Sequence, residues 1–467
     1  MSQRNRTRAR LATLLMILGS LLVPSLLTAQ RAELEKIIKR KVLSNGLEVI
    51  VVENHGVPLA TIEVDVRNGS FTQTPEYAGL AHMYEHMFFR ANSKYPDPEA
   101  FVGQAGDLGA VFNGTTAEER VNYYLTVSTD SLDAGIRFLS AALLSPLFRQ
   151  DELERERQVV IGEYDRNESS PFFQLNQEMD RLLYPGNFSR KNIIGDRQVI
   201  LTTTPEKMRA IQRKYYVPNN SALIVSGDVD ASRVFATAER ELNGWKRGPD
   251  PFVADPVPPI PALTKNEAVV VEAGVGAVTV FLQWQGPSVG KDPKSTYAAD
   301  VFSDVLNDPG SNFQQRLVDS GLWQSMGVNY YTLNNVGPIT ISGQTSPGNL
   351  RKAIAALEAE IRKFNDPGYF DAGELEAVKA HRAVTSAFDR ERASGFAHTL
   401  GFWWSVADLE YYMGYVDNMA KQTTADLRAY ARRYIVGKPR ITGVLIDPAA
   451  RQQINLTTME LMREGTE

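Results

Sequence analysis

MRAIQRKYYVPNNSALIVSGDV, at residues 208–229, decides the fold, because a similar stretch returns 219 residues later as LRAYARRYIVGKPRITGVLIDP, at residues 427–448. Each copy has the pattern of an amphipathic helix followed by an apolar strand. Another pair lies at nearly the same spacing: the alternating strand ATIEVDVRNGS, which begins at Ala60, matches VTVFLQWQGPS, which begins at Val278. A repeat of this length indicates a duplicated domain rather than a solenoid.

Both halves mix period-2 strands with period-3.6 helices and lack strict β-α-β alternation. This pattern predicts an α+β protein of two tandem homologous α/β sandwich domains, each with a mixed or antiparallel sheet and long helices. Between the halves, residues 249–263 contain six prolines, which is typical of an extended, semi-rigid linker. We therefore expect an N-terminal domain over residues 30–248 and a C-terminal domain over residues 264–467.

The first 29 residues have the organisation of a secretory signal peptide. Four arginines precede an apolar run over residues 11–27, and Thr28 and Ala29 provide the small residues of a cleavage site. We predict cleavage near Ala29 and a periplasmic or otherwise exported protein without a stable membrane span. If uncleaved, the same segment would be an N-terminal membrane anchor.

Composition narrows the function further. The 467-residue chain has a net charge of -5 and no cysteine, so it is neither disulfide-stabilised nor basic enough to suggest a nucleic acid partner. Only five histidines occur, so a cluster of them is informative.

Two of these histidines belong to the pentapeptide His82-Met-Tyr-Glu-His86. We expect a helix that begins at Thr74, where Thr-Pro-Glu is typical of an N-terminus, and runs through Phe89. On this helix the two histidines lie one turn apart with Glu85 beside them. Two neutral imidazoles can then bind one Zn²⁺, and the carboxylate can take a proton from a water molecule that the metal activates. The alternative is a half-buried helix whose imidazoles are hydrogen-bonded for structure alone.

A catalytic zinc ion needs a third protein ligand. The charged helical stretch DELERERQVVIGEYDR, at residues 151–166, contains Glu156 and Glu163, which are two turns apart and share nearly one face. The local pattern leaves two interpretations open. Either Glu163 is the ligand, or the acids of this stretch form a solvated face of ion pairs with the neighbouring arginines.

Four segments resemble the pitrilysin and insulinase family of zinc metallopeptidases, which includes mitochondrial processing peptidase. They are GLAHMYEHMFFRANSKYP from Gly79, GAVFNGTTAEERVNYY from Gly109, ERERQVVIGEY from Glu154 and YYVPNNSALIVSGDVD from Tyr215. The pentapeptide is the family's inverted zinc motif, H-x-x-E-H. The resemblance implies paired α/β domains of similar fold, which form half of a four-domain clamshell, with one active zinc site in the N-terminal copy.

Carried over by position, the resemblance implies that His82, His86 and Glu163 hold one Zn²⁺ per chain and that Glu85 is the catalytic base. Glu156 matches a second acidic position that supports the site by orienting a ligand imidazole.

Asn113 matches an asparagine on the strand along which these enzymes bind their peptide substrate. From the residues alone, Asn113-Gly114 is also typical of a turn.

The second half has lost the metal motif. At the repeat offset of 218 residues, the three motif positions are taken by Asp300, Ser303 and Asp304, which are not a zinc triad. The resemblance gives this half the role of closing over the substrate.

Active members of the family place an Arg and a Tyr seven residues apart in this half, near a Gly-Leu pair, to hold the substrate and polarise its carbonyl. Here those positions are Leu317 and Gln324, so both side chains are missing. A register shift that lets Arg316 and Tyr330 or Tyr331 compensate is the alternative.

These observations predict an exported zinc metalloendopeptidase that hydrolyses peptides or unfolded segments. Because the Arg/Tyr pair is missing, we expect a heterodimer with a homologous subunit that lacks the zinc motif and carries the pair. The alternative is a catalytically silent, metal-binding interaction subunit of a peptidase-like complex.

Overall fold

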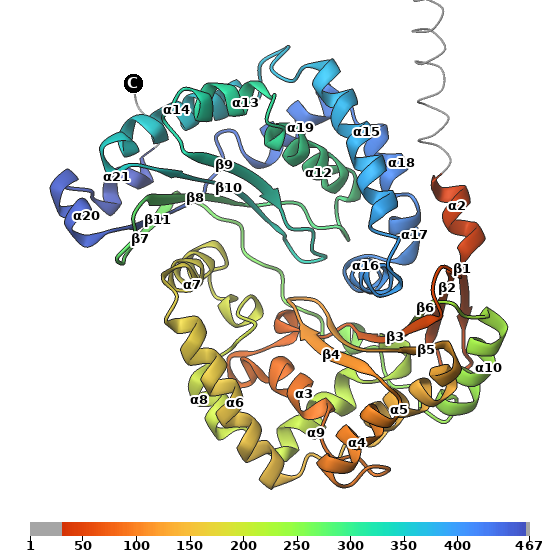
Figure 1. Cartoon of the computed structure of the whole chain (residues 1–467). Coiled ribbons are helices and arrows are strands. Elements are labelled where there is room, and N and C mark those ends of the chain that lie inside the picture. The colour runs from red at the N-terminus through yellow and green to blue at the C-terminus, as the bar shows by residue number, and fades with distance from the viewer. Residues whose placement is uncertain (1–29, 464–467) are drawn as a thin grey trace, which may run out of the picture.

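Two β-sheets, one from each half of the chain, organise the fold (Figure 1). In this computed structural model, which describes residues 30–463, the first sheet has the strand order β1-β2-β6-β3-β5-β4 and the second has the order β7-β11-β8-β10-β9. The predicted signal peptide, residues 1–29, lies outside the described residues.

The first sheet is mixed: β2 runs parallel to β6, and the remaining pairs are antiparallel. Its strands are β1 (Ile38–Val42), β2 (Glu48–Glu53), β3 (Leu59–Val66), β4 (Val111–Thr116), β5 (Val121–Ser128) and β6 (Ser221–Gly227). The second sheet is mixed in the same way, with β7 parallel to β11. Its strands are β7 (Glu267–Glu272), β8 (Val278–Gln285), β9 (Ser325–Tyr330), β10 (Pro338–Thr345) and β11 (Ile441–Ile446).

The sequence repeat is visible in the strand order. β7, β11, β8, β10 and β9 occupy the places of β2, β6, β3, β5 and β4, and the described part of the second half has no strand in the position of β1. The two mixed sheets with their helices confirm the predicted α+β class. Asn113 and Gly114 lie inside β4, so the structure favours the strand interpretation over the turn.

Helices cover the outer face of each sheet (Figure 1). The first half contributes α3 (Leu80–Phe88), α4 (Pro98–Asp107), α5 (Leu132–Leu144), α6 (Gln150–Glu168), α8 (Arg197–Thr202), α9 (Pro205–Tyr215) and α10 (Ala231–Leu242), after the N-terminal α2 (Gln30–Ile37). The second half contributes α12 (Pro293–Asn307), α13 (Asn312–Gln314), α14 (Leu350–Lys363), α15 (Ala372–Phe388), α17 (Leu409–Met413), α18 (Tyr415–Ala420), α19 (Thr424–Tyr434), α20 (Pro448–Ile454) and α21 (Thr458–Met462). No helix within residues 30–463 has both the length and the apolar character needed to cross a membrane.

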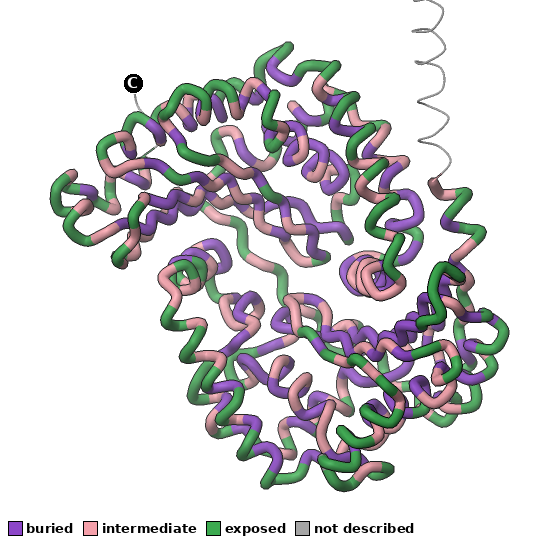
Figure 2. Tube along the Cα trace, viewed as in Figure 1, coloured by how far each residue is buried: buried purple, intermediate pink, exposed green. Residues whose placement is uncertain are grey.

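Two helices lie between the sheets, and each covers the sheet of the other half. α7 (Pro171–Leu183), from the first half, packs on β7 and β11, where Leu175 and Met179 form a cluster with Ile441 and Leu445. α16 (Ala393–Val406), from the second half, packs on β3 and β6. Figure 2 shows buried residues along both sheets and on these two helices. The exchange ties the two halves together through apolar surface that each half would otherwise expose.

The proline-rich segment between the halves is not extended throughout. Pro251–Ala254 forms the single helical turn α11, because the Asp250 side chain accepts hydrogen bonds from the backbone of Phe252 and Val253 and Pro251 occupies the first turn. Residues 255–264 then form neither helix nor strand.

The predicted start of the histidine helix is wrong. Pro75–Tyr77 forms only a 3₁₀ turn, and the α-helix begins at Leu80. Gly79 interrupts the helix with a φ of 91°, and the buried Gln73 side chain accepts hydrogen bonds from the backbone of Gly79 (2.9 Å) and Ala81 (3.2 Å). Gln73, whose amide group donates to the distant Ser189 and Asn192 carbonyls, therefore caps this helix in place of the local Thr-Pro-Glu signal.

We predict that Gly79→Ala lowers the thermal midpoint more than Gly109→Ala does. Both glycines have positive φ, which costs an L-residue about 1–2 kcal/mol. A Cβ at position 79 would also lie 2.7 Å from the Ile194 carbonyl oxygen, whereas position 109 has no atom within 4 Å. Thermal denaturation of both variants measures the difference; equal midpoints would contradict the assigned backbone contact.

Candidate metal centre

The candidate centre lies between α3 and α6. α3 buries Leu80, Met83, Tyr84 and Met87 in the core of the first half. Its other side, with His82, Glu85 and His86, is turned toward α6 and β4, which both pack on α3. This orientation follows from the helical period, since positions i, i+3 and i+4 share a face.

Three side chains converge at spacing suited to a metal ion. The Nε2 atoms of His82 and His86 are 3.3 Å apart, and Glu163 Oε2 lies 3.5 Å from the first and 3.6 Å from the second. Tetrahedral zinc with bonds of about 2.0–2.1 Å requires ligand atoms about 3.3–3.4 Å apart. The three residues therefore fit zinc, and they form the one such group of His, Cys, Asp or Glu side chains within residues 30–463.

The electrostatic surroundings suit metal binding. Burial, and secondly the charge of His86, lowers the pKa of His82 to about 3, so this imidazole is neutral with a lone pair available. Burial alone would lower the pKa of His86, but the Glu156 hydrogen bond and the nearby carboxylates raise it.

Glu156 contacts the far side of the His86 ring. Its Oε2 lies 3.2 Å from His86 Nδ1, and its Oε1 forms an ion pair with Arg90 Nη2 at 2.7 Å. A carboxylate in this place fixes the imidazole tautomer, so that Nε2 presents its lone pair to the metal position. Glu156 and Glu163 share one face of α6, but Glu156 contacts His86 Nδ1, whereas Glu163 lies near the Nε2 atoms of His82 and His86.

Glu85 is held between α3 and β4. The Thr116 hydroxyl donates to Glu85 Oε2 over 3.1 Å, and burial raises the pKa of the Glu85 carboxyl group. β4 can approach so closely because residue 114 is glycine: a Cβ there would lie 2.9 Å from Glu85 Oε1. The result is a carboxyl group of raised basicity beside the two histidines.

A cavity of about 590 Å³ opens in front of these groups. All residues of its wall belong to the first half, and they include Asn113 and Thr115 of β4. β4 is the last strand of its sheet, and its free edge has no partner strand in the described part of the chain. The predicted substrate residue Asn113 is therefore exposed at a sheet edge that borders the candidate centre.

The equivalent place in the second half holds an ion-paired network. Asp300, Ser303 and Asp304 lie on α12. Asp304 pairs with Arg382 (2.5 Å), and Asp300 accepts a bond of 2.7 Å from the Tyr415 hydroxyl. The positions that correspond to the His82-Glu85-His86 motif thus hold side chains that pack and pair within the second half.

The positions expected for the Arg/Tyr pair are Leu317, which is 1% exposed in the core of the second half, and Gln324, which is exposed. Arg316 pairs with Glu360 at 2.7 Å, and the Tyr330 hydroxyl donates to the Pro287 carbonyl. Arg316 and Tyr330, two of the residues that could compensate for the missing pair, thus have their partners within the second half.

Tyr331 differs from these residues. Burial, followed by the charge of Glu118, raises the pKa of Tyr331, and Glu118 belongs to the wall of the cavity. The Tyr331 ring also stacks on Phe402 of α16, with ring centroids 6.2 Å apart, and Tyr331 is not part of the cavity wall.

Sequence reasoning missed three residues that support the site: Gln73, Gly114 and Thr116. Gly114 and Thr116 lie two residues apart on one face of β4, so strand alternation could have paired them. The partner of that face, Glu85, depends on tertiary packing that no local pattern encodes.

Comparison with known families agrees with this geometry. The profile described as Insulinase (Peptidase family M16) matches residues 48–185, which include every residue of the candidate centre. A second profile, described as Peptidase M16 inactive domain, matches residues 202–381, which include Asp300 and Asp304. Together the two ranges cover more than half of the chain.

Individual proteins show the same relationship. The zinc protease PqqE of Helicobacter pylori is 26% identical over 406 residues, which are 84% of this chain and 89% of the relative. A crystal structure of a protease from Helicobacter pylori has a TM-score of 0.79 at 23% identity, covering 88% of this chain and 99% of that one. The periplasmic protease PqqL from Escherichia coli has a TM-score of 0.76 at 17% identity, covering 91% of this chain and 49% of that one. At these identities the two structures establish a shared fold.

We predict that Glu156→Gln weakens zinc binding by about 10–100-fold, because the His86 ring loses the carboxylate that orients it. Glu154→Gln, an exposed change on the same helix, is the control and should bind as the wild type does. Competition with a chromophoric chelator measures both affinities. Equal affinities for the two variants would contradict the orienting role.

Proposed function

Since the chain belongs to the insulinase family of peptidases, peptidase family M16, we propose that it is a zinc metallopeptidase that hydrolyses peptide bonds in peptides or unfolded segments. The observation that carries this proposal is the convergence of His82, His86 and Glu163 at zinc spacing with Glu85 beside them. A purely structural zinc site has four protein ligands and gains nothing from a free carboxylate next to it.

His82, His86 and Glu163 would hold the zinc ion, with Glu156 behind His86. Bound there, zinc supplies Lewis acidity, which polarises the scissile carbonyl and lowers the pKa of water. Glu85 would take the proton of the attacking water and pass it to the leaving amine. Thr116 keeps the Glu85 carboxyl group in position for both transfers.

The free edge of β4 supplies the means of binding the substrate. An extended peptide can pair with the unused N–H and C=O groups of this edge, which gives affinity with little sequence preference. Asn113 would contact the peptide from the same strand. A folded domain cannot present an extended strand there, so the substrates would be peptides or unfolded segments.

We predict that Glu85→Gln retains one zinc ion per chain and loses peptide cleavage. The amide has nearly the shape of the carboxylate but cannot accept the proton, and general-base catalysis contributes about 10²–10⁴-fold in rate. Zinc content by atomic emission and cleavage of a quenched fluorogenic peptide are measured on the same sample. Glu99→Gln, an exposed change on α4, serves as the control. Cleavage by Glu85→Gln at the control rate would overturn the assignment.

We further propose that the protein is exported and works as a heterodimer with a homologous subunit. Export is supported by the signal-like residues 1–29. Partnership is supported by a cavity wall that comes from the first half alone and by the match to about half the length of PqqL. The missing Arg/Tyr pair at Leu317 and Gln324 would come from a subunit that lacks the zinc motif.

The chain alone should therefore cleave peptides at about 10²–10³-fold below the rate of the complete complex, because it lacks donors that stabilise the oxyanion. Native mass spectrometry of the complex purified from its source should show this chain with one homologous chain. Restoring Arg at position 317 is a poor test, since Leu317 is buried and the charge would lie in the core. Full activity from a monomer or homodimer would contradict the proposal.

A further inference from the structure

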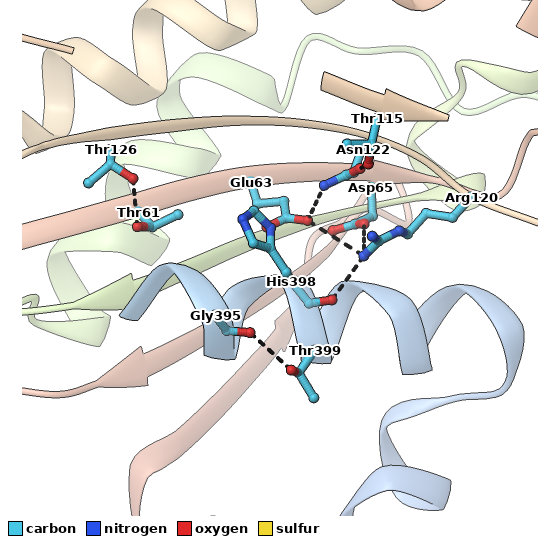
Figure 3. A network of polar contacts seen from close by, with 10 residues as sticks. All are labelled: Thr61, Glu63, Asp65, Thr115, Arg120, Asn122, Thr126, Gly395, His398 and Thr399. Atoms are coloured by element: carbon cyan, nitrogen blue, oxygen red, sulfur yellow. Dashed lines mark hydrogen bonds and ion pairs between the residues drawn. The ribbon is translucent and has the colours of Figure 1, made fainter. Parts of the chain in front are cut away.

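A buried polar network joins the two halves on the face of the first sheet opposite α3 (Figure 3). Glu63 and Asp65 of β3 are both 0% exposed, and their side chains point toward α16, which comes from the second half. Carboxyl groups are rarely buried unless they are paired, so two adjacent ones at a contact between halves require an explanation.

Glu63 is bound from both sides. His398 of α16 places Nδ1 2.5 Å from Glu63 Oε2, and Asn122 of β5 donates from Nδ2 to Glu63 Oε1 over 2.6 Å. Hydrogen bonds to a charged group are the stronger class. His398 also packs edge-on against Tyr124, with ring centroids 4.4 Å apart.

The neighbouring carboxyl group, Asp65, has no hydrogen bond partner in the described part of the chain. Burial, and secondly the charge of Glu63, raises the pKa of Asp65 well above its usual range. Arg120 Nη1 lies 3.7 Å from Asp65 and donates to the His398 carbonyl oxygen over 2.9 Å. α16 approaches Asp65 at Gly401, where a Cβ would lie 2.4 Å from the carboxylate oxygens. Arg120 thus contacts both the buried carboxyl groups of β3 and the backbone of α16.

From Glu63 the network continues into the cavity wall. Asn122 accepts a hydrogen bond from the Thr115 hydroxyl of β4. Thr115 belongs to the wall of the cavity, and the next residue, Thr116, binds Glu85. A continuous line of contacts thus runs from His398 in the second half, through Glu63 and Asn122, to the strand that holds the candidate base.

We propose that His398 and Glu63 are positioning residues, which couple the docking of the second half to the placement of edge strand β4 and hence to substrate binding. This inference rests on the proposed peptidase function. β4 pairs with only one strand, so it lacks the second row of backbone hydrogen bonds that fixes a central strand. The Thr115–Asn122–Glu63 contacts hold it in its place, and α16 completes them.

The test compares His398→Phe, which keeps the ring beside Tyr124 but removes the N–H donor, with His398→Asn, whose amide can replace that donor. His55→Phe is the matched control, because His55 forms a similar pair with Asp228 (Nδ1–Oδ1 2.6 Å) on the exposed surface of the first half. Asn122→Ala breaks the next contact in the line.

For His398→Phe we expect KM for a quenched fluorogenic peptide to rise about tenfold, the factor that corresponds to one hydrogen bond of this class. Zinc content should be unchanged, His398→Asn should restore most of the affinity, and His55→Phe should match the wild type. The double variant His398→Phe/Asn122→Ala should have a KM, relative to the wild type, that is smaller than the product of the two single-variant ratios, because both changes act through Glu63.

Hydrogen exchange measured by mass spectrometry on the same variants gives a reading that does not depend on activity. Amides of residues 111–116 should exchange faster in His398→Phe than in His55→Phe, while those of β6 stay protected. Unchanged exchange in β4 together with unchanged KM would overturn the inference. If the wild type cleaves no peptide even in its complete complex, the proposed function fails, and the exchange of β4 alone decides whether the coupling exists.

Discussion

The packing of α3 against α6 is the contact on which the rest of the structure depends. It brings imidazole nitrogens from one helix and a carboxylate oxygen from the other to separations of 3.3–3.6 Å, which no single helix could provide. The same contact places Glu156 behind His86, so the candidate ligand Glu163 and the carboxylate that contacts His86 come from one face of α6. Burial lowers the local dielectric, which strengthens the attraction between a bound cation and these ligand atoms.

Duplication gave the chain two copies of one architecture with different uses. The first copy carries the candidate zinc ligands, while the second fills the equivalent place with the Asp304–Arg382 pair and the Asp300–Tyr415 hydrogen bond. The copies are joined by exchanged helices, since α7 covers the second sheet and α16 covers the first. α16 also carries His398, so the exchange places a polar group of the second half against Glu63 of β3, from which Asn122 and Thr115 lead to β4.

Much of the fold and the core of the candidate site could be predicted from the sequence. The spacing of His82, Glu85 and His86 and the period of a helix were enough to place these side chains on one face. The choice between Glu156 and Glu163 needed the resemblance, because the period puts both on one face and only the position of α6 decides which nitrogen each meets. Features set by distant contacts could not be predicted. The Gln73 cap moved the helix start, and an amphipathic pattern does not say that α16 covers the sheet of the other half.

The most direct measurement is X-ray diffraction at the zinc absorption edge, from crystals of Glu85→Gln grown with zinc and a bound peptide. The account predicts one anomalous peak about 2.0–2.1 Å from Nε2 of His82, Nε2 of His86 and a carboxylate oxygen of Glu163, with the peptide paired along the free edge of β4. An absent peak, a peak elsewhere, or a peptide bound away from β4 would contradict it.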